Sequence, residues 1–354
     1  MPFSLGKGLC GPDWEAFRSD AMSNLRIVLL LLATLAGCSP VVVPAGAPIR
    51  PPTLEADRYI AADGSVLKLA TWPAVGGTPK AIILGIHGFG DYRKAWEEPA
   101  EIWAADGITT YAYDQRGFGS SATRGRWAGV PTMVEDIRTV ASLIRQKYPD
   151  VPLYLAGESM GGALVMAAAD KPLDVDGLVL VAAALRSRDT LGPFLSGGLS
   201  FFAHTVPWLP SGPTSIDFQP TDNPKTMEKM RNDALILRNP RVDLGYGLVE
   251  AMDAGKAAAP NIDKPYLMLH GIGDRLVPIA PVRSAIEVMP RRPDSHLAFY
   301  RNGYHMLLRD KQGALVARDI AAWIQDKDQP LPSGADVQVS RPELARLWGS
   351  KRSD

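Results

Sequence analysis

The chain has 354 residues, of which 46% are hydrophobic and 21% are charged, and this composition is typical of a globular protein with one large core or two modest domains. Its 38 basic and 38 acidic residues give a formal net charge of zero, which excludes the basic excess expected of a nucleic-acid-binding protein. Both cysteines, Cys10 and Cys38, precede the region expected to fold, so we expect neither disulfides nor thiolate metal sites to hold the fold together.

The N-terminal part of the chain has the pattern of a secretory leader. Residues 27–36 form an apolar run behind Arg26 that is too short to span a bilayer and suits the hydrophobic region of a signal peptide. The run ends in Leu35-Ala36-Gly37-Cys38, which is similar to a bacterial lipobox, where the cysteine is lipidated and becomes the first mature residue. Residues 1–37 are therefore interpreted as an extension and signal peptide, with Met22 as an alternative start.

An ordinary cleaved signal and a buried helix are the alternatives to a lipid anchor. The small residues directly before Cys38 favour the anchor, and several acyl chains on one residue would hold a protein stably at a membrane. By resemblance to bacterial sorting patterns, Ser39 points to the outer membrane. We therefore expect a lipid-anchored protein of the bacterial cell envelope, on the outer membrane and facing the periplasm, with residues 38–57 as a Pro/Ala-rich tether.

Strand and helix patterns alternate from residue 58 onward. The extended segments on either side of Asp63-Gly64 predict a hairpin, and later apolar runs are typical of strands buried on both faces. Alternation of this kind predicts an α/β fold with a mostly parallel sheet flanked by helices. The expected strands are 58–74 (two segments), 81–87, 108–114, 153–156, 177–185, 265–270 and 296–300, and the expected helices are 95–105, 131–147, 162–169, 280–289 and 313–324.

Residues 186–263 interrupt this alternation, because about 75 residues pass without a strand pattern. A loop of that length is unusual inside a compact domain, so we predict an inserted helical cap over the carboxyl ends of the strands. The core then comprises residues 58–185 and 264–328, and residues 329–354 form a C-terminal tail in which a short helix is expected at 342–348. Most apolar residues of the cap are expected to form its own core, and a subset is the candidate lining of an acyl-binding channel: Phe194, Leu195, Phe201, Phe202 and Trp208.

The pentapeptide Gly157-Glu158-Ser159-Met160-Gly161 lies between a predicted strand and a predicted helix, the context of a nucleophile elbow. Glycines two positions either side of Ser159 leave room for so tight a turn. A serine hydroxyl is a poor nucleophile until a base removes its proton and a carboxylate orients that base. Ser159 is therefore the candidate nucleophile.

Two polar residues follow the last two predicted strands of the core. They are Asp274 and His305, in the order serine, acid, histidine that this fold type uses, and at the sheet edge where ligands bind. His87 and His270 each precede a glycine at a strand end and are expected to be structural. Asp189, after the strand at 177–185, is the competing candidate for the acid.

The oxyanion of an acyl-transfer reaction needs two backbone donors. The N–H of Met160, directly after the nucleophile, is one candidate, and the N–H of Phe89 in His87-Gly88-Phe89-Gly90 is the other. Glu158 stands beside the nucleophile and cannot reach the far nitrogen of His305, so we expect it to hydrogen-bond the surrounding loops.

Together these positions resemble the α/β-hydrolase superfamily, and within it the monoacylglycerol lipase or lysophospholipase branch with its serine aminopeptidase relatives. The resemblance spans about residues 58–326 and implies that Ser159 attacks, that His305 acts as base and then acid, and that Asp274 orients His305. Glu158 departs from the family, where many members carry His, and Phe89 is bulkier than the usual small residue. The motifs are His87-Gly88-Phe89-Gly90, Tyr113 to Ser121, Gly157 to Gly162, Gly273-Asp274-Arg275 and Tyr304-His305.

The resemblance implies a serine hydrolase of carboxylic esters, with monoacylglycerols or lysophospholipids as leading substrates. A peptidase that removes N-terminal residues, an acyltransferase and a non-catalytic scaffold are the alternatives. The sequence has no metal-ligand cluster, phosphate-cradling loop or nucleotide fingerprint, so we expect no metal and no cofactor. A peptidase would need acids in the cap to hold the substrate amine, and the candidates are Glu228, Asp233, Asp243 and Glu250.

Overall fold

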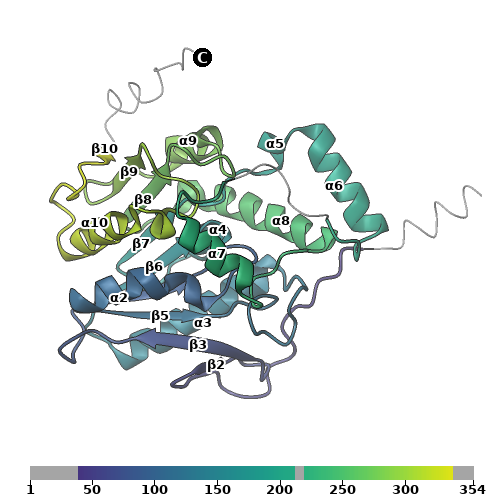
Figure 1. Ribbon diagram of the computed structural model, residues 1–354. Coiled ribbons are helices and arrows are strands. Elements are labelled where there is room, and N and C mark those ends of the chain that lie inside the picture. The colour runs from purple at the N-terminus through teal and green to yellow at the C-terminus, as the bar shows by residue number, and fades with distance from the viewer. Residues whose placement is uncertain (1–38, 212–218, 338–354) are drawn as a thin grey trace, which may run out of the picture.

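The computed structural model describes residues 39–211 and 219–337, which fold around one mixed sheet (Figure 1). The strand order is β1-β2-β3-β5-β4-β6-β7-β8-β9-β10, and the inner strands from β5 to β9 run parallel, while β1, β2, β3 and β10 pair antiparallel. The prediction of a mostly parallel sheet is confirmed. The strands are β1 Thr53–Leu54, β2 Arg58–Ile60, β3 Val66–Trp72, β4 Ala81–Ile86, β5 Ile108–Tyr113, β6 Leu153–Glu158, β7 Gly177–Val181, β8 Tyr266–Gly271, β9 His296–Tyr300 and β10 Asp336–Val337.

Helices cover both faces of this sheet, because the inner strands are apolar on both sides. In β4, Ile82, Leu84 and Ile86 face one core cluster, and Ile83 faces the other. The first cluster is closed by α3, α4, α8 and α9, and the second by α2 and α10. The helices are η1 Arg93–Trp96, α2 Glu97–Ala105, α3 Val130–Lys147, α4 Met160–Ala168, α5 Arg188–Leu191, α6 Pro193–Thr205, α7 Pro224–Asn232, α8 Val242–Ala258, η2 Ala259–Asn261, α9 Ile279–Val288, η3 Leu307–Arg309 and α10 Gly313–Gln325.

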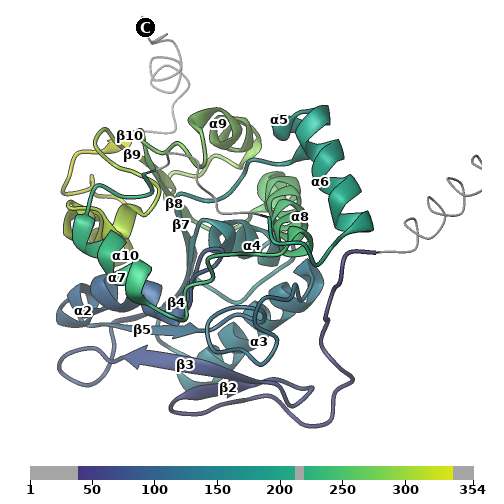
Figure 2. The ribbon, with the colours of Figure 1, turned by 45° about the vertical axis from the view of Figure 1, so that its right-hand side comes forward.

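The described part of the segment between β7 and β8 contains four α-helices and the short η2, and the α-helices occupy different places. Helix α8 packs along α4 and so belongs to the layer that covers one face of the sheet (Figure 1). Small residues allow this contact, since a Cβ atom on Gly255 would lie 2.7 Å from the carbonyl oxygen of Ala163. Helix α6 packs on the outer side of α8, and α5 packs on α6 (Figure 2). The structure thus assigns one part of residues 186–263 to the sheet-covering layer.

Two predicted boundaries differ from the structure by more than two residues. The strand expected at 177–185 ends at Val181, because Ala182 takes a positive φ of 44° that a strand does not allow. The expected tail contributes β10, which pairs with β9. The short helix expected at 342–348 lies outside the described residues. Within the described part of the chain, no helix combines the length and hydrophobicity that crossing a membrane requires.

The segment expected to be a tether is bound along the surface of the domain. Backbone N–H groups donate from Val43 to the carbonyl of Trp127 (2.7 Å) and from Ile49 to the carbonyl of Ala62 (2.8 Å). Gly46 N–H donates to the carboxylate of Asp63 at 3.0 Å. Residues 43–49 therefore form a strap that hydrogen bonds fix to the domain, rather than a free spacer.

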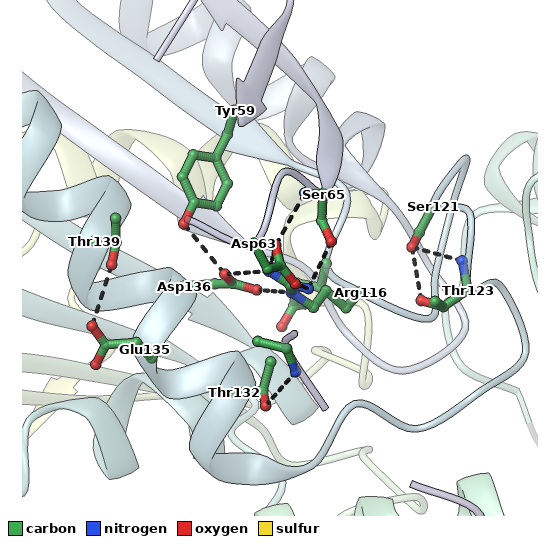
Figure 3. Close-up of polar contacts among 12 residues, drawn as sticks. Tyr59, Asp63, Ser65, Arg116, Ser121, Thr123, Thr132, Glu135, Asp136 and Thr139 are labelled. Atoms are coloured by element: carbon green, nitrogen blue, oxygen red, sulfur yellow. Dashed lines mark hydrogen bonds and ion pairs between the residues drawn. The ribbon is translucent and has the colours of Figure 1, made fainter. Parts of the chain in front are cut away.

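Arg116 links the β2–β3 hairpin to helix α3, and the strap joins the same cluster through the hydrogen bond from Gly46 to Asp63 (Figure 3). Its guanidinium donates to Asp63 at 2.7 Å and to Asp136 at 2.7 Å, and Tyr59 donates to Asp136 at 3.3 Å. The hydrogen bond from Arg116 holds the pKa of Asp63 well below its usual range, whereas burial raises the pKa of Asp136. Breaking a buried pair of this kind leaves an uncompensated charge, so the cluster fixes three segments relative to one another.

We expect Asp63→Asn to lower the free energy of unfolding by about 1.5–3 kcal/mol at pH 7, since it removes charged hydrogen bonds to Arg116. Because the folded pKa of Asp63 lies below its unfolded value near 3.8, this contribution is present above that pH and is lost as the pH falls. Urea unfolding from pH 7 to pH 3 should therefore show the difference between wild type and variant shrinking in acid. A difference that grows in acid would contradict the assignment.

Candidate functional site

Ser159 occupies a tight turn between β6 and α4. Its φ of 55° and ψ of −118° are unusual for a residue other than glycine, and such strain is typical of functional sites. The turn is closed by glycines, since a Cβ atom on Gly157 would lie 2.4 Å from the oxygen of Gly161, and one on Gly161 would lie 2.0 Å from the oxygen of Ile86. The requirement for glycine at both positions is therefore steric, and the turn projects Ser159 from the carboxyl end of β6.

Three side chains from three strand ends meet at this turn. His305, after β9, lies with Nε2 at 2.9 Å from Ser159 Oγ, and its Nδ1 lies 2.7 Å from Asp274 Oδ2. Asp274 follows β8, and its other oxygen accepts the N–H groups of Leu276 and Val277. With Nδ1 donating to the carboxylate, Nε2 of a neutral imidazole is the acceptor that faces the serine hydroxyl. This arrangement can take the serine proton.

Asp274 is held as a carboxylate in spite of its burial. Burial alone would raise its pKa, but the neighbouring His305 and the backbone N–H of Val277 outweigh that effect and leave the pKa of Asp274 below its usual range. An ionised Asp274 at 2.7 Å from Nδ1 can orient the imidazole of His305 and would stabilise its protonated form.

The competing candidates lie elsewhere. Asp189 is in α5, where it accepts hydrogen bonds from Ser187 and from Lys256, and its side chain is 64% exposed. His87 accepts the N–H of Gln115 at Nε2 (3.0 Å), and its Nδ1 lies 2.8 Å from the oxygen of Gly88, so it serves to hold a loop. His270 is buried, and burial lowers its pKa to about 4.

The candidate oxyanion donors lie on two segments beside Ser159. Met160 is the first residue of α4, where the N–H groups have no acceptor within the helix. The loop 87–90 lies against the nucleophile, since a Cβ atom on Gly88 would be 3.3 Å from Ser159 Cβ. The bulky ring of Phe89 packs edge-on against Phe118 with centroids 5.5 Å apart, so the ring is accommodated by the core.

A buried ion cluster adjoins the site and was missed by sequence reasoning. Arg309, in η3, donates to Glu158 at 2.6 Å and to Asp91 at 2.7 Å, and all three residues are buried. The expectation that Glu158 bonds to surrounding loops agrees with this contact. The sequence offered one clue, the unusual carboxylate next to the nucleophile, but no pattern identified its distant partner.

The candidate acyl-channel residues are exposed rather than enclosed. Phe194 in α6 is 91% exposed, and Leu195, Phe201, Phe202 and Trp208 are each about half exposed or more. Together with Leu209 they form an apolar surface on α6 and the turn that follows it. A surface of this kind marks contact with lipid, protein or ligand in a soluble domain.

A cavity of 610 Å³ lies beside α7, and its described lining does not include Ser159, Asp274 or His305. Among the described residues, no group of three or more His, Cys, Asp or Glu side chains is arranged to hold a metal ion. The cavity is lined by Gln219, Thr221, Asp222, Pro224, Met227, Glu228, Arg231 and Asn232.

Comparisons with known proteins identify relatives across most of the chain. A family model described as serine aminopeptidase, S33 matches residues 77–312. The monoacylglycerol lipase of Mycolicibacterium smegmatis is 27% identical over 253 residues, covering 70% of this chain and 88% of that protein. The monoglyceride lipase of Mus musculus is 29% identical over 294 residues, covering 80% of this chain and 95% of the mouse protein.

Solved structures share the same fold. The crystal structure of Paleococcus ferrophilus monoacylglycerol lipase superposes with a TM-score of 0.62 at 22% identity, covering 74% of this chain and 99% of that one. A soluble variant of monoglyceride lipase from Saccharomyces cerevisiae, in complex with a substrate analog, gives a TM-score of 0.65 at 18% identity, covering 82% and 99%. The predicted α/β-hydrolase fold is thereby confirmed.

Proposed function

Because the chain belongs to the serine aminopeptidase S33 family, we propose that it hydrolyses fatty-acyl esters, monoacylglycerols foremost, through Ser159, His305 and Asp274. The observation that carries the proposal is the 2.9 Å contact between His305 Nε2 and Ser159 Oγ, backed by the 2.7 Å contact between His305 and Asp274. The coarser conclusion, a serine ester hydrolase with the α/β-hydrolase fold, rests on the family match and on relatives named lipases.

In the acylation step, Ser159 Oγ attacks the ester carbonyl carbon while its proton passes to His305 Nε2. The carbonyl oxygen gains the negative charge and accepts hydrogen bonds from the N–H groups of Phe89 and Met160. When the tetrahedral intermediate collapses, the imidazolium returns its proton to the departing alcohol oxygen, and the acyl group stays on Ser159. Asp274 remains ionised throughout.

In the deacylation step, the same groups act on water. His305 takes a proton from a water molecule as its oxygen attacks the acyl carbon, and the second tetrahedral intermediate uses the same two donors. Collapse returns the proton to Ser159 Oγ and releases the fatty acid. An alcohol in place of water would give acyl transfer, so the two outcomes differ only in what enters the site at this step.

The apolar surface on α6 supports a lipid substrate. Exposed Phe194, Phe201 and Phe202 suit contact with acyl chains or with a lipid surface, while a site for a polar peptide would not need them. Two of the cap acids considered for an aminopeptidase are already engaged, since Asp243 is paired with Arg241 and Asp233 accepts a hydrogen bond from Tyr92. These contacts favour an ester over an aminoacyl amide.

We also propose that Cys38 carries a lipid anchor in a bacterial envelope, on the outer membrane facing the periplasm. The lipobox-like Leu35-Ala36-Gly37-Cys38 motivates the proposal. In Figures 1 and 2 the N-terminal end of the described chain lies beside the C-terminal end of α6, so the anchor and the apolar surface would share one side of the molecule.

Removal of the nucleophile tests the catalytic assignment. A fluorophosphonate probe should label the wild-type protein and leave Ser159→Ala unlabelled. Asp274→Asn should lower kcat for a monoacylglycerol by on the order of a thousandfold or more, because His305 then loses its orienting charge. The matched control Asp189→Asn, at an exposed carboxylate paired with Lys256, should stay within about threefold of wild type. The opposite pattern would transfer the acid role to Asp189.

A substrate panel tests the chemical class. Protein truncated before Val41 should turn over monoacylglycerol with a kcat/KM at least about tenfold above that for an aminoacyl amide, because only the ester offers an acyl chain to the apolar surface. Lysophospholipid and a short p-nitrophenyl ester complete the panel and show whether head group or chain length sets the preference. Faster turnover of the aminoacyl amide would make the protein a peptidase.

Metabolic labelling with palmitate tests the anchor. Expressed in a Gram-negative bacterium, the full chain should incorporate labelled palmitate, and globomycin should block its processing. Cys38→Ala should abolish the labelling, with Cys10→Ala as the matched control that keeps it. Retention of palmitate by Cys38→Ala would refute the anchor while leaving the catalytic proposal intact.

A further inference from the structure

One buried guanidinium touches the chain segments on either side of the catalytic turn. Arg309 Nη1 lies 2.7 Å from Asp91 Oδ2, and Arg309 Nη2 lies 2.6 Å from Glu158 Oε2. The three side chains are each no more than 10% exposed. The two carboxylates come from residues 67 positions apart in sequence (158 − 91 = 67), so this contact is a product of the tertiary fold.

Each partner belongs to a segment that carries a candidate catalytic group. Asp91 ends the loop that contains Phe89, and its N–H donates to the oxygen of Gly88 at 3.3 Å. Glu158 is the last residue of β6 and directly precedes Ser159. Arg309 itself follows the base, His305, by four residues. The guanidinium therefore connects the oxyanion loop, the nucleophile turn and the base-bearing segment.

The backbone of the same residue holds the start of α7. The carbonyl oxygen of Arg309 accepts hydrogen bonds from Thr221 (3.2 Å), Asn223 (3.2 Å) and Thr226 (2.9 Å). These donors lie on the segment between β7 and β8, next to the base-bearing loop. One residue thus joins four segments around the site, with its side chain directed to the sheet edge and its carbonyl to α7.

The cost of this cluster indicates that it serves more than stability. Burial raises the pKa of Glu158 in spite of Arg309, and one oxygen of Glu158 and Nε of Arg309 are buried without a partner in the described residues. Well-packed apolar side chains often stabilise a protein as well as, or better than, a buried ion cluster. What a guanidinium adds is a planar fork that fixes the positions of two acceptors at once.

We propose that Arg309 is a positioning residue, which sets the distance between the loop of Phe89 and the turn of Ser159 through Asp91 and Glu158. The inference rests on the proposed function, since the quantity that Arg309 sets is the fit of both N–H donors to one oxyanion. It acts through the two carboxylates and does not touch the substrate. Loss of the fork should therefore weaken binding of the transition state more than binding of the substrate.

The test compares Arg309→Lys with Arg116→Lys. Arg116 is a matched control, because it is also buried and also bridges two carboxylates, Asp63 and Asp136 (Figure 3). Fluorophosphonate titration counts the reactive sites in each preparation, so that kcat is expressed per reactive site and a smaller folded fraction does not lower it. A trifluoromethyl ketone, which adds to the serine to form a tetrahedral oxyanion, supplies an inhibition constant that reports on the donors.

For Arg309→Lys we expect a loss of kcat per site on the order of ten- to a hundredfold, with KM changed less than about threefold and the trifluoromethyl ketone weakened in parallel with kcat/KM. Arg116→Lys should lower the melting temperature and leave kcat per site and inhibition within about threefold of wild type. Glu158→Gln keeps an acceptor for Arg309, so its loss of kcat per site should be smaller than that of Arg309→Lys. Inhibition by the trifluoromethyl ketone should again weaken in parallel with kcat/KM.

The proposal is overturned if the folded variants of Arg309 and Glu158 match wild type in kcat per site and in inhibition. Any loss of total activity would then reflect only a smaller number of titratable sites. Glu158→Gln carries this test even where Arg309→Lys is too unstable to purify. An unlabelled wild-type protein would instead reject the serine hydrolase proposal, so the two failures are distinguishable.

Discussion

The chemistry proposed for this protein depends on the contact between His305 and Ser159. The contact exists because β6, β8 and β9 run parallel, so that the residues following them emerge at one edge of the sheet. Parallel strands in turn require helical crossovers on both faces, which bury the sheet and make the edge rigid. The topology of the sheet thus brings together two side chains that are 146 residues apart in sequence, at a hydrogen-bond distance of 2.9 Å. The strained φ of Ser159 is tolerated because Gly157 and Gly161 pack so closely against neighbouring backbone that the surrounding structure fixes the conformation of the turn.

Two buried arginines, Arg116 and Arg309, each bridge two carboxylates but fix different parts of the fold. Arg116 holds peripheral elements, since Asp63 lies in the β2–β3 hairpin and Asp136 in α3, and neither residue lies next to a catalytic candidate along the chain. Arg309 has the same fork and the same pair of acceptors, yet both of its acceptors adjoin the candidate site. The two clusters differ in which segments the guanidinium fixes. Rigidity near Ser159 matters more because donors that stabilise developing charge must be in place before the charge appears.

Local patterns in the sequence were sufficient for the alternating fold and for the turn around Ser159. Periodicity and glycine spacing are local properties, and they predicted the strands and the sharp turn before any tertiary contact was known. The order of the predicted strands was enough to prefer Asp274 over Asp189 as the acid. Both residues follow a predicted strand, but only the strand before Asp274 is next in chain order to the strand before His305. The contact of Arg309 with Glu158 could not be found this way, since it joins residues 151 apart with no repeating pattern. The bound strap was also missed, because a Pro/Ala-rich composition describes a free linker and a docked one equally well, and only the acceptors on Trp127 and Ala62 distinguish them.

The strap changes what a lipid anchor would do. Val43 is fixed to Trp127, and the five residues from Cys38 to that point span at most about 18 Å even when fully extended. A lipidated Cys38 would therefore keep the domain close to the bilayer and restrict its rotation, where a free tether would let it turn. The N-terminal end of the described chain lies beside the C-terminal end of α6, so the restricted orientation would bring this helix, which carries the exposed Phe201 and Phe202, towards the lipid. An acyl ester leaving the membrane would then meet apolar side chains first, and less apolar surface would be exposed to water on its way to Ser159.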